Sequence, residues 1–138
     1  MTAPDSPAGR DRVTPAPMIT VTDVPAAAAF YARLLGADAH VFAPAFAHVR
    51  ADGTPVLQLH ADDAADGHDL LADPGRVRGH GVLLWFTVTD FDAACTRAEA
   101  DRGAATDGPV HTNPNTGGRE LWLTCPEGYR VVLAEPVG

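Results

Sequence analysis

The chain has 138 residues, which fits a single domain, and its 46% hydrophobic and 20% charged residues are typical of a globular protein. Its 18 acidic residues outnumber its 10 basic ones, and the formal net charge of −8 would repel nucleic-acid phosphates and anionic membrane surfaces. No apolar run approaches the roughly 20 residues that a membrane span requires. We therefore expect neither nucleic acid nor a membrane as a partner.

Residues 1–17 contain four prolines and no apolar segment, so they predict a disordered tail rather than a secretory signal. The two cysteines, Cys95 and Cys125, are too few for a disulfide framework and are not spaced as a CxxC motif. Both observations favour a cytoplasmic protein.

An internal repeat begins after the tail. Thr20-Val21-Thr22-Asp23 recurs letter for letter as Thr87-Val88-Thr89-Asp90. In each copy the aspartate is a typical N-terminal helix cap, and a glycine that suits the C-terminal cap follows, Gly36 or Gly103. The pattern predicts helices over 24–35 and 91–102, each preceded by a short strand.

Strand patterns follow each predicted helix. In the first half they cover the region near 40–42, 46–50 and 56–60, and in the second half the region near Val110, 120–124 and 130–134. Each half then has the order βαβββ. A polar, acidic stretch over 61–79 separates the halves. The expected fold is α+β, one domain over 18–138, with module one over 18–60, a linker over 61–79 and module two over 80–136.

This tandem arrangement resembles the vicinal oxygen chelate superfamily, which includes glyoxalase I, extradiol dioxygenases, and fosfomycin and bleomycin resistance proteins. The resemblance rests on Phe30-Tyr31-x-x-Leu34-Leu35-Gly36 and on the segment Gly118-Arg119-Glu120-Leu121-Trp122-Leu123-Thr124-Cys125-Pro126-Glu127-Gly128. The second segment is similar to the family's GREF…DPxGN signature, with Cys125 in place of the first aspartate and Tyr129 in place of the asparagine. The resemblance to this superfamily implies a half-open curved sheet with helices on its convex side and the ligand on its concave side.

The resemblance also indicates where a metal would bind in the enzymes of this superfamily. The four matching positions hold Ala16, Leu83, Gln58 and Val132. Alanine, leucine and valine have no lone pair to donate, so three of the four ligands are missing. We therefore expect no cofactor and no metal at this site, and the sequence presents no other catalytic constellation.

Strand alternation places aromatic side chains on the concave side. Trp85 and Trp122 fall there, since their neighbours Leu84, Phe86, Leu121 and Leu123 occupy the helix-facing rows, and Phe46 and Phe42 are expected to join them. Aromatic faces stack on planar ligands and attract cations. The polar residues expected to orient such a ligand are His48, Gln58, His60, Glu120 and Arg130.

Within the superfamily the pattern is most similar to the bleomycin resistance proteins, which are metal-free and bind the drug in clefts between the subunits of a dimer. The resemblance implies a homodimer that sequesters a planar or cationic small molecule, an antibiotic or a metabolite, without chemistry. An alternative is a lyase, isomerase or dioxygenase with a metal relocated to His48 and His60, or with acid–base chemistry at Glu120. A third is an accessory protein whose cavity its own tryptophans fill.

Overall fold

A computed structural model describes residues 13–62, 75 and 77–137. Most of the expected tail and most of the expected linker therefore lie outside the described residues. Within the described part of the chain, no helix combines the length and apolar character needed to cross a membrane.

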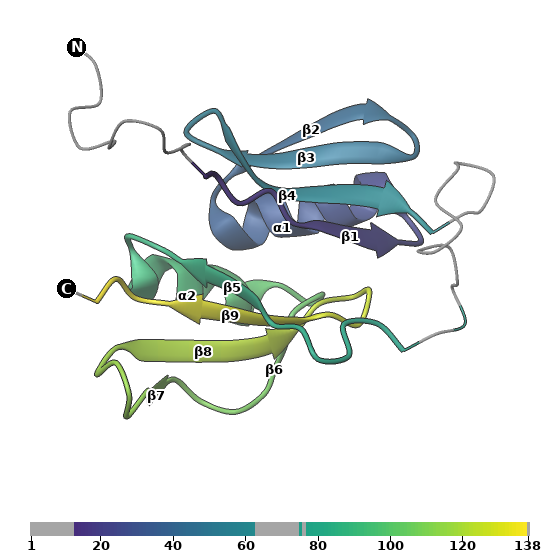
Figure 1. Cartoon of the computed structure of the whole chain (residues 1–138). Helices are drawn as coiled ribbons and strands as arrows, with labels where there is room; N and C mark the ends of the chain where they lie inside the picture. The colour runs from purple at the N-terminus through teal and green to yellow at the C-terminus, as the bar shows by residue number, and fades with distance from the viewer. Residues whose placement is uncertain (1–12, 63–74, 76, 138) are drawn as a thin grey trace, which may run out of the picture.

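Module one forms a four-stranded sheet with one helix (Figure 1). Its elements are β1 (Met18–Val21), α1 (Val24–Leu35), β2 (Asp38–Ala43), β3 (Phe46–Ala51) and β4 (Thr54–Ala61). The sheet order is β1-β4-β3-β2, in which β1 runs parallel to β4 and the other neighbours are antiparallel.

Module two repeats this plan. Its elements are β5 (Leu84–Thr87), α2 (Phe91–Ala100), β6 (Ala105–Thr106), β7 (His111–Thr112), β8 (Arg119–Thr124) and β9 (Arg130–Ala134). The sheet order is β5-β9-β8-β6, β7 also pairs with β8, and β5 runs parallel to β9. The α+β fold of two βαβββ modules is confirmed, with two separate sheets rather than one continuous sheet.

Both helices begin at the predicted aspartates. The Asp23 carboxylate accepts a 3.0 Å hydrogen bond from the Ala26 backbone N–H, and Asp90 accepts one of 3.1 Å from Ala93. These bonds satisfy backbone donors that have no partner inside the helix. Gly36 ends α1 in the left-handed conformation at φ 62°, as predicted.

The prediction for Gly103 is wrong. Helix α2 ends at Ala100, its C-terminal cap is Asp101 in an extended conformation, and the N–H of Gly103 donates to the Asp101 carboxylate at 2.9 Å. A Cβ at Gly103 would lie 3.0 Å from both the Phe30 ring and Pro126. Close packing against Phe30 of module one and Pro126 of module two therefore favours glycine here, and helix termination does not.

The single strand predicted near Val110 is replaced by two short pairings on either side of it. Ala105–Thr106 (β6) and His111–Thr112 (β7) both pair with β8, and residues 107–110 leave the sheet between them. Gly108, at φ 103°, and Pro109 lie in this interruption. Proline has no N–H to contribute to a ladder, which explains why the pairing does not continue.

One hydrophobic core contains side chains of both modules. Of the predicted helix-facing residues, Leu84, Leu121 and Leu123 are buried and Phe86 packs half-buried against the core. The core also contains the buried strand residues Ile19, Val21, Val131 and Leu133, with Val88 half-buried against it. Figure 1 shows α1 and α2 on the same side of the two sheets. The opposite face of each sheet, which the helices do not cover, is called the open face below.

The modules are held together at the end of β1. The Tyr129 hydroxyl donates to the Thr20 backbone oxygen at 2.7 Å. The Glu127 carboxylate accepts from the backbone N–H groups of Thr22 and Asp23 at 3.0 and 3.1 Å. A turn of module two therefore binds the junction between the first strand and the first helix of module one.

Candidate functional site

The two tryptophans lie in one row across the open face of module two. Trp85 on β5 pairs with Val132 on β9, and Val132 pairs with Trp122 on β8. Val132 is fully buried between them, whereas Trp85 is 44% exposed. Trp85 and Trp122 therefore lie on the same face of the sheet, as expected, on either side of a buried valine.

Glu120 lies beside this row and is 3% exposed. Its carboxylate accepts hydrogen bonds from the Trp122 indole Nε1 at 2.9 Å and from Asn113 Nδ2 at 2.6 Å. The Nε2 of His111 is 3.4 Å from its Oε1. Burial by itself would raise the pKa of Glu120, but these three partners favour the charged form and the pKa is lowered.

Asn113 and His111 come from the long segment between β6 and β8. Strand alternation does not predict that this segment lies close to Glu120. The second predicted polar residue of module two, Arg130, is 3.4 Å from the Asp107 carboxylate of the same segment and is mostly exposed. Glu120 and Arg130 thus both contact this segment, and Asn113 is a site residue that the sequence pattern did not identify.

The aromatic residues of module one form their own cluster on its open face. The rings of Phe42 and Phe46 stack at 5.4 Å, and both meet the His48 ring nearly edge-on, at 4.8 and 5.2 Å. The sequence pattern did not identify two further members. The His40 ring is 4.7 Å from that of Phe42, and the Arg50 guanidinium lies 5.4 Å over the same ring.

Cross-strand pairing explains the membership of His40. It lies directly opposite His48 in the register of β2 and β3, so both side chains share a face. The Nδ1 of His48 also contacts the guanidinium of Arg50 at 3.4 Å. Phe42 remains 49% exposed, because β2 is the edge strand of its sheet.

Gln58 and His60 lie on β4, next to this cluster. The side-chain amide of Gln58 donates to the backbone oxygen of Ala16 at 2.9 Å. His60 is 8% exposed, and its Nδ1 is 2.9 Å from the backbone oxygen of Ala61. Its ring is 6.3 Å from that of Phe46. Both polar side chains therefore contact backbone oxygens, one just before β1 and one at the end of β4.

The nine predicted site residues consequently fall into two groups, one on each module. No ring contact joins the two groups among the residues that the structure describes. One member, Trp85, lines a cavity of about 540 Å³ between the modules. The other walls of this cavity are mainly apolar, and they are formed by Thr14, Pro15, Pro17, Thr54, Pro55, Val56 and residues 82–87.

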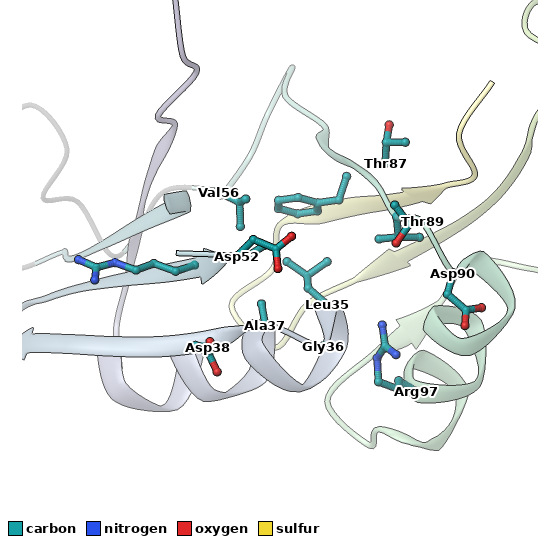
Figure 2. A pocket seen from close by; sticks show the side chains of 14 residues that line it. Leu35, Gly36, Ala37, Asp38, Asp52, Val56, Thr87, Thr89, Asp90 and Arg97 are labelled. Carbon is teal, nitrogen blue, oxygen red and sulfur yellow. The ribbon is translucent and has the colours of Figure 1, made fainter. Parts of the chain in front are cut away.

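A second cavity of about 580 Å³ opens beside the first (Figure 2). The two share Val56, Phe86 and Thr87 as lining residues, so they adjoin along the junction of the modules. Figure 2 shows Asp38 and Asp52 on the wall from module one, and Asp90 and Arg97 on the wall from module two. None of the predicted site residues lines it; its walls are formed by residues 35–38, 50–52, 56, 86–90 and 97.

The residues at the positions of the superfamily's metal ligands do not fit a divalent metal. Leu83 lines the apolar cavity, Val132 is buried between the tryptophans, and the amide of Gln58 binds the backbone of Ala16. Within the described part of the chain, no three His, Cys, Asp or Glu side chains lie close enough together to hold a metal ion.

Solved structures with the same fold come from several bacteria. A lactoylglutathione lyase from Agrobacterium tumefaciens is 20% identical, with 91% of this chain and 95% of that chain covered and a TM-score of 0.67. A glyoxalase/bleomycin resistance protein/dioxygenase family enzyme from Burkholderia phytofirmans is 21% identical, with 87% and 95% covered and a TM-score of 0.70. At these identities the likeness concerns the fold alone.

A protein described as a glyoxalase/bleomycin resistance protein/dioxygenase from Nocardioides is similar at 20% identity, with 94% of this chain and 87% of that chain covered and a TM-score of 0.66. No curated protein matches the chain. The profile of one family matches residues 11–133, which is most of the sequence and covers all of module one and nearly all of module two. The chain therefore belongs to the Glyoxalase/Bleomycin resistance protein/Dioxygenase superfamily.

Proposed function

We propose that the chain binds a planar small molecule, an antibiotic or a metabolite, without transforming it and without a resident metal. The proposal rests on the mainly apolar cavity of about 540 Å³ that Trp85 lines. Its volume is within the range of roughly 300–1,000 Å³ that small-molecule sites occupy. Leu83, at the position of a metal ligand in enzymes of the superfamily, contributes an apolar wall instead.

The row of Trp85, Val132 and Trp122 supports the same proposal. The indole of Trp85 is 44% exposed, so one of its faces is accessible to a planar ligand. Stacked aromatic pairs add to the affinity beyond the area that they bury.

The test is a calorimetric titration of the full chain in EDTA, with bleomycin and indole as probes. Trp85→Ala is expected to weaken binding about tenfold or more, because it removes both the stacking surface and apolar contact area. Trp85→Phe is the matched control and retains most of the affinity, since the ring remains. Saturable binding in EDTA with this pattern supports the proposal.

Two outcomes would contradict it. If the double variant Trp85→Ala/Trp122→Ala loses cooperative unfolding, the tryptophans are core residues and this site assignment is wrong. If binding occurs only after Zn²⁺ or Fe²⁺ is added, the enzymatic alternative with a relocated metal gains support. His48→Ala and His60→Ala would then identify its ligands.

We also propose that the protein functions as a homodimer. The edge strand β2 is exposed along its whole length, and it presents Val41 and Phe42 with 46% and 49% of their surfaces accessible. An edge strand with exposed apolar side chains is a typical pairing surface. Light scattering should give twice the chain mass for the wild type and a monomer for Phe42→Asp. Val77→Asp, at a residue that is 84% exposed outside any strand, is the control and should leave the dimer intact.

A further inference from the structure

Glu120 is a buried carboxylate with three partners that come from two parts of module two. Trp122 lies on the same strand, two residues along, whereas Asn113 and His111 belong to the segment that precedes β8. Removing an ionised carboxylate from water costs several kcal/mol unless donors replace the water, which these three groups do. The Glu120 carboxylate therefore orients both the Trp122 indole and the His111 imidazole.

The contact with Glu120 has a consequence for the two nitrogens of His111. The Nε2 faces Oε1 of an ionised carboxylate, which can only accept a hydrogen bond. The proton of a neutral imidazole is therefore favoured on Nε2, and Nδ1 is left with a lone pair. The His111 side chain is 48% exposed, and its ring centre is 6.3 Å from that of Trp122.

We propose that His111 selects ligands with an N–H or O–H donor at the edge of a planar ring, and that Glu120 is the positioning residue that orients it. This inference rests on the proposed function, because it concerns a ligand stacked on Trp122. A ring lying against that indole reaches the neighbouring imidazole. There Nδ1 accepts the ligand's proton donor while Nε2 remains held by Glu120.

The first test requires no ligand. Long-range ¹H–¹⁵N spectra of the uniformly labelled chain report which imidazole nitrogen of each histidine carries the proton, and His111→Gln identifies the signals of His111. At neutral pH the Nε2-protonated form is expected for the wild type. In Glu120→Gln this preference should weaken, since the neutral amide favours Nε2 protonation less than a carboxylate does. A predominantly Nδ1-protonated His111 in the wild type would overturn the inference.

The second test compares two probes of the same shape. Indole carries a ring N–H, and benzofuran has an oxygen in its place. The wild type is expected to prefer indole about three- to tenfold, the effect of one hydrogen bond. In His111→Ala the two affinities should become nearly equal, and Glu120→Gln should reduce the preference. Asn115→Ala is the matched control, because Asn115 is an exposed residue of the same segment whose printed hydrogen bond comes from its backbone N–H, and it should keep the preference.

The outcomes separate this inference from the proposed function. If the wild type binds benzofuran as tightly as indole, ligand selection by His111 is wrong and the proposed function stands. If Asn115→Ala loses the preference to the same degree as Glu120→Gln, the preference depends on the position of the whole segment, and the role of Glu120 in orienting His111 is overturned. If neither probe binds, the proposed function fails for planar ligands, and the ligand class assigned here fails with it.

Discussion

The hydroxyl of Tyr129 in module two donates a 2.7 Å hydrogen bond to the backbone oxygen of Thr20 in module one. Tyr129 occupies the position where the signature of the superfamily has asparagine, and its side chain is 9% exposed. The same oxygen also accepts from the guanidinium of Arg78. The contact between the modules therefore includes a partly buried hydrogen bond between residues 109 positions apart in the sequence.

Tyr129→Phe should lower the free energy of unfolding by about 1 kcal/mol, the typical net contribution of one hydrogen bond. The oxygen of Thr20 retains Arg78 as a donor, so a larger loss is not expected. Urea unfolding followed by circular dichroism measures the change. An unchanged midpoint would show that the hydroxyl contributes nothing across the junction.

Tyr31→Phe provides the opposite case. The Tyr31 side chain is fully buried, and its hydroxyl makes no hydrogen bond of normal geometry within the described part of the chain. It lies beside the thiol of Cys125, a weak partner, and burial raises the pKa of Tyr31 well above its usual range. Removing a buried hydroxyl without a good partner should leave stability equal or raise it by up to about 1 kcal/mol. A loss comparable to that of Tyr129→Phe in the same urea titration would contradict this.

Gly36→Ala tests the end of α1. Gly36 is at φ 62°, and a Cβ there would lie 3.2 Å from the guanidinium carbon of Arg97, whose Nε donates to the Leu34 backbone oxygen. Left-handed strain alone costs about 1–2 kcal/mol. Gly53→Ala is the matched control, since Gly53 has φ 76° with nothing within 4 Å of the added Cβ. Thermal unfolding should show the larger loss for Gly36→Ala; equal losses would mean that Arg97 moves aside at no cost.

Glu120 predicts a dependence of stability on pH. Its pKa is lowered in the folded chain, so the stabilisation is fully present above the ordinary value of 4.5 and is lost as the pH falls through the folded-state pKa. Asp101 and Glu135 also have lowered pKa values, which makes the difference between wild type and Glu120→Gln the informative quantity. Urea titrations from pH 7 to pH 3 should show this difference shrinking below about pH 4.5. A difference that stays constant over this range would contradict the ionised state of Glu120.

Local features of the fold were predictable from the sequence because each is decided by neighbours along the chain. The bounds of α1, the aspartate caps and the rows of buried strand residues follow from cap chemistry and from alternation. The same local reasoning failed at Gly103, where Phe30 and Pro126 of other segments decide why a glycine is present. It failed also near Val110, where the strand is interrupted.

For the candidate site, sequence alternation correctly placed Trp85 and Trp122 in one row of the open face. It could not show that His111 and Asn113 meet Glu120, or that Trp85 borders a cavity shared with residues preceding β1. Alternation describes one strand at a time and decides which face a side chain occupies. The position of one module against the other, and of a long segment over a sheet, depends on packing between residues far apart in the sequence, so only the tertiary structure determines these contacts.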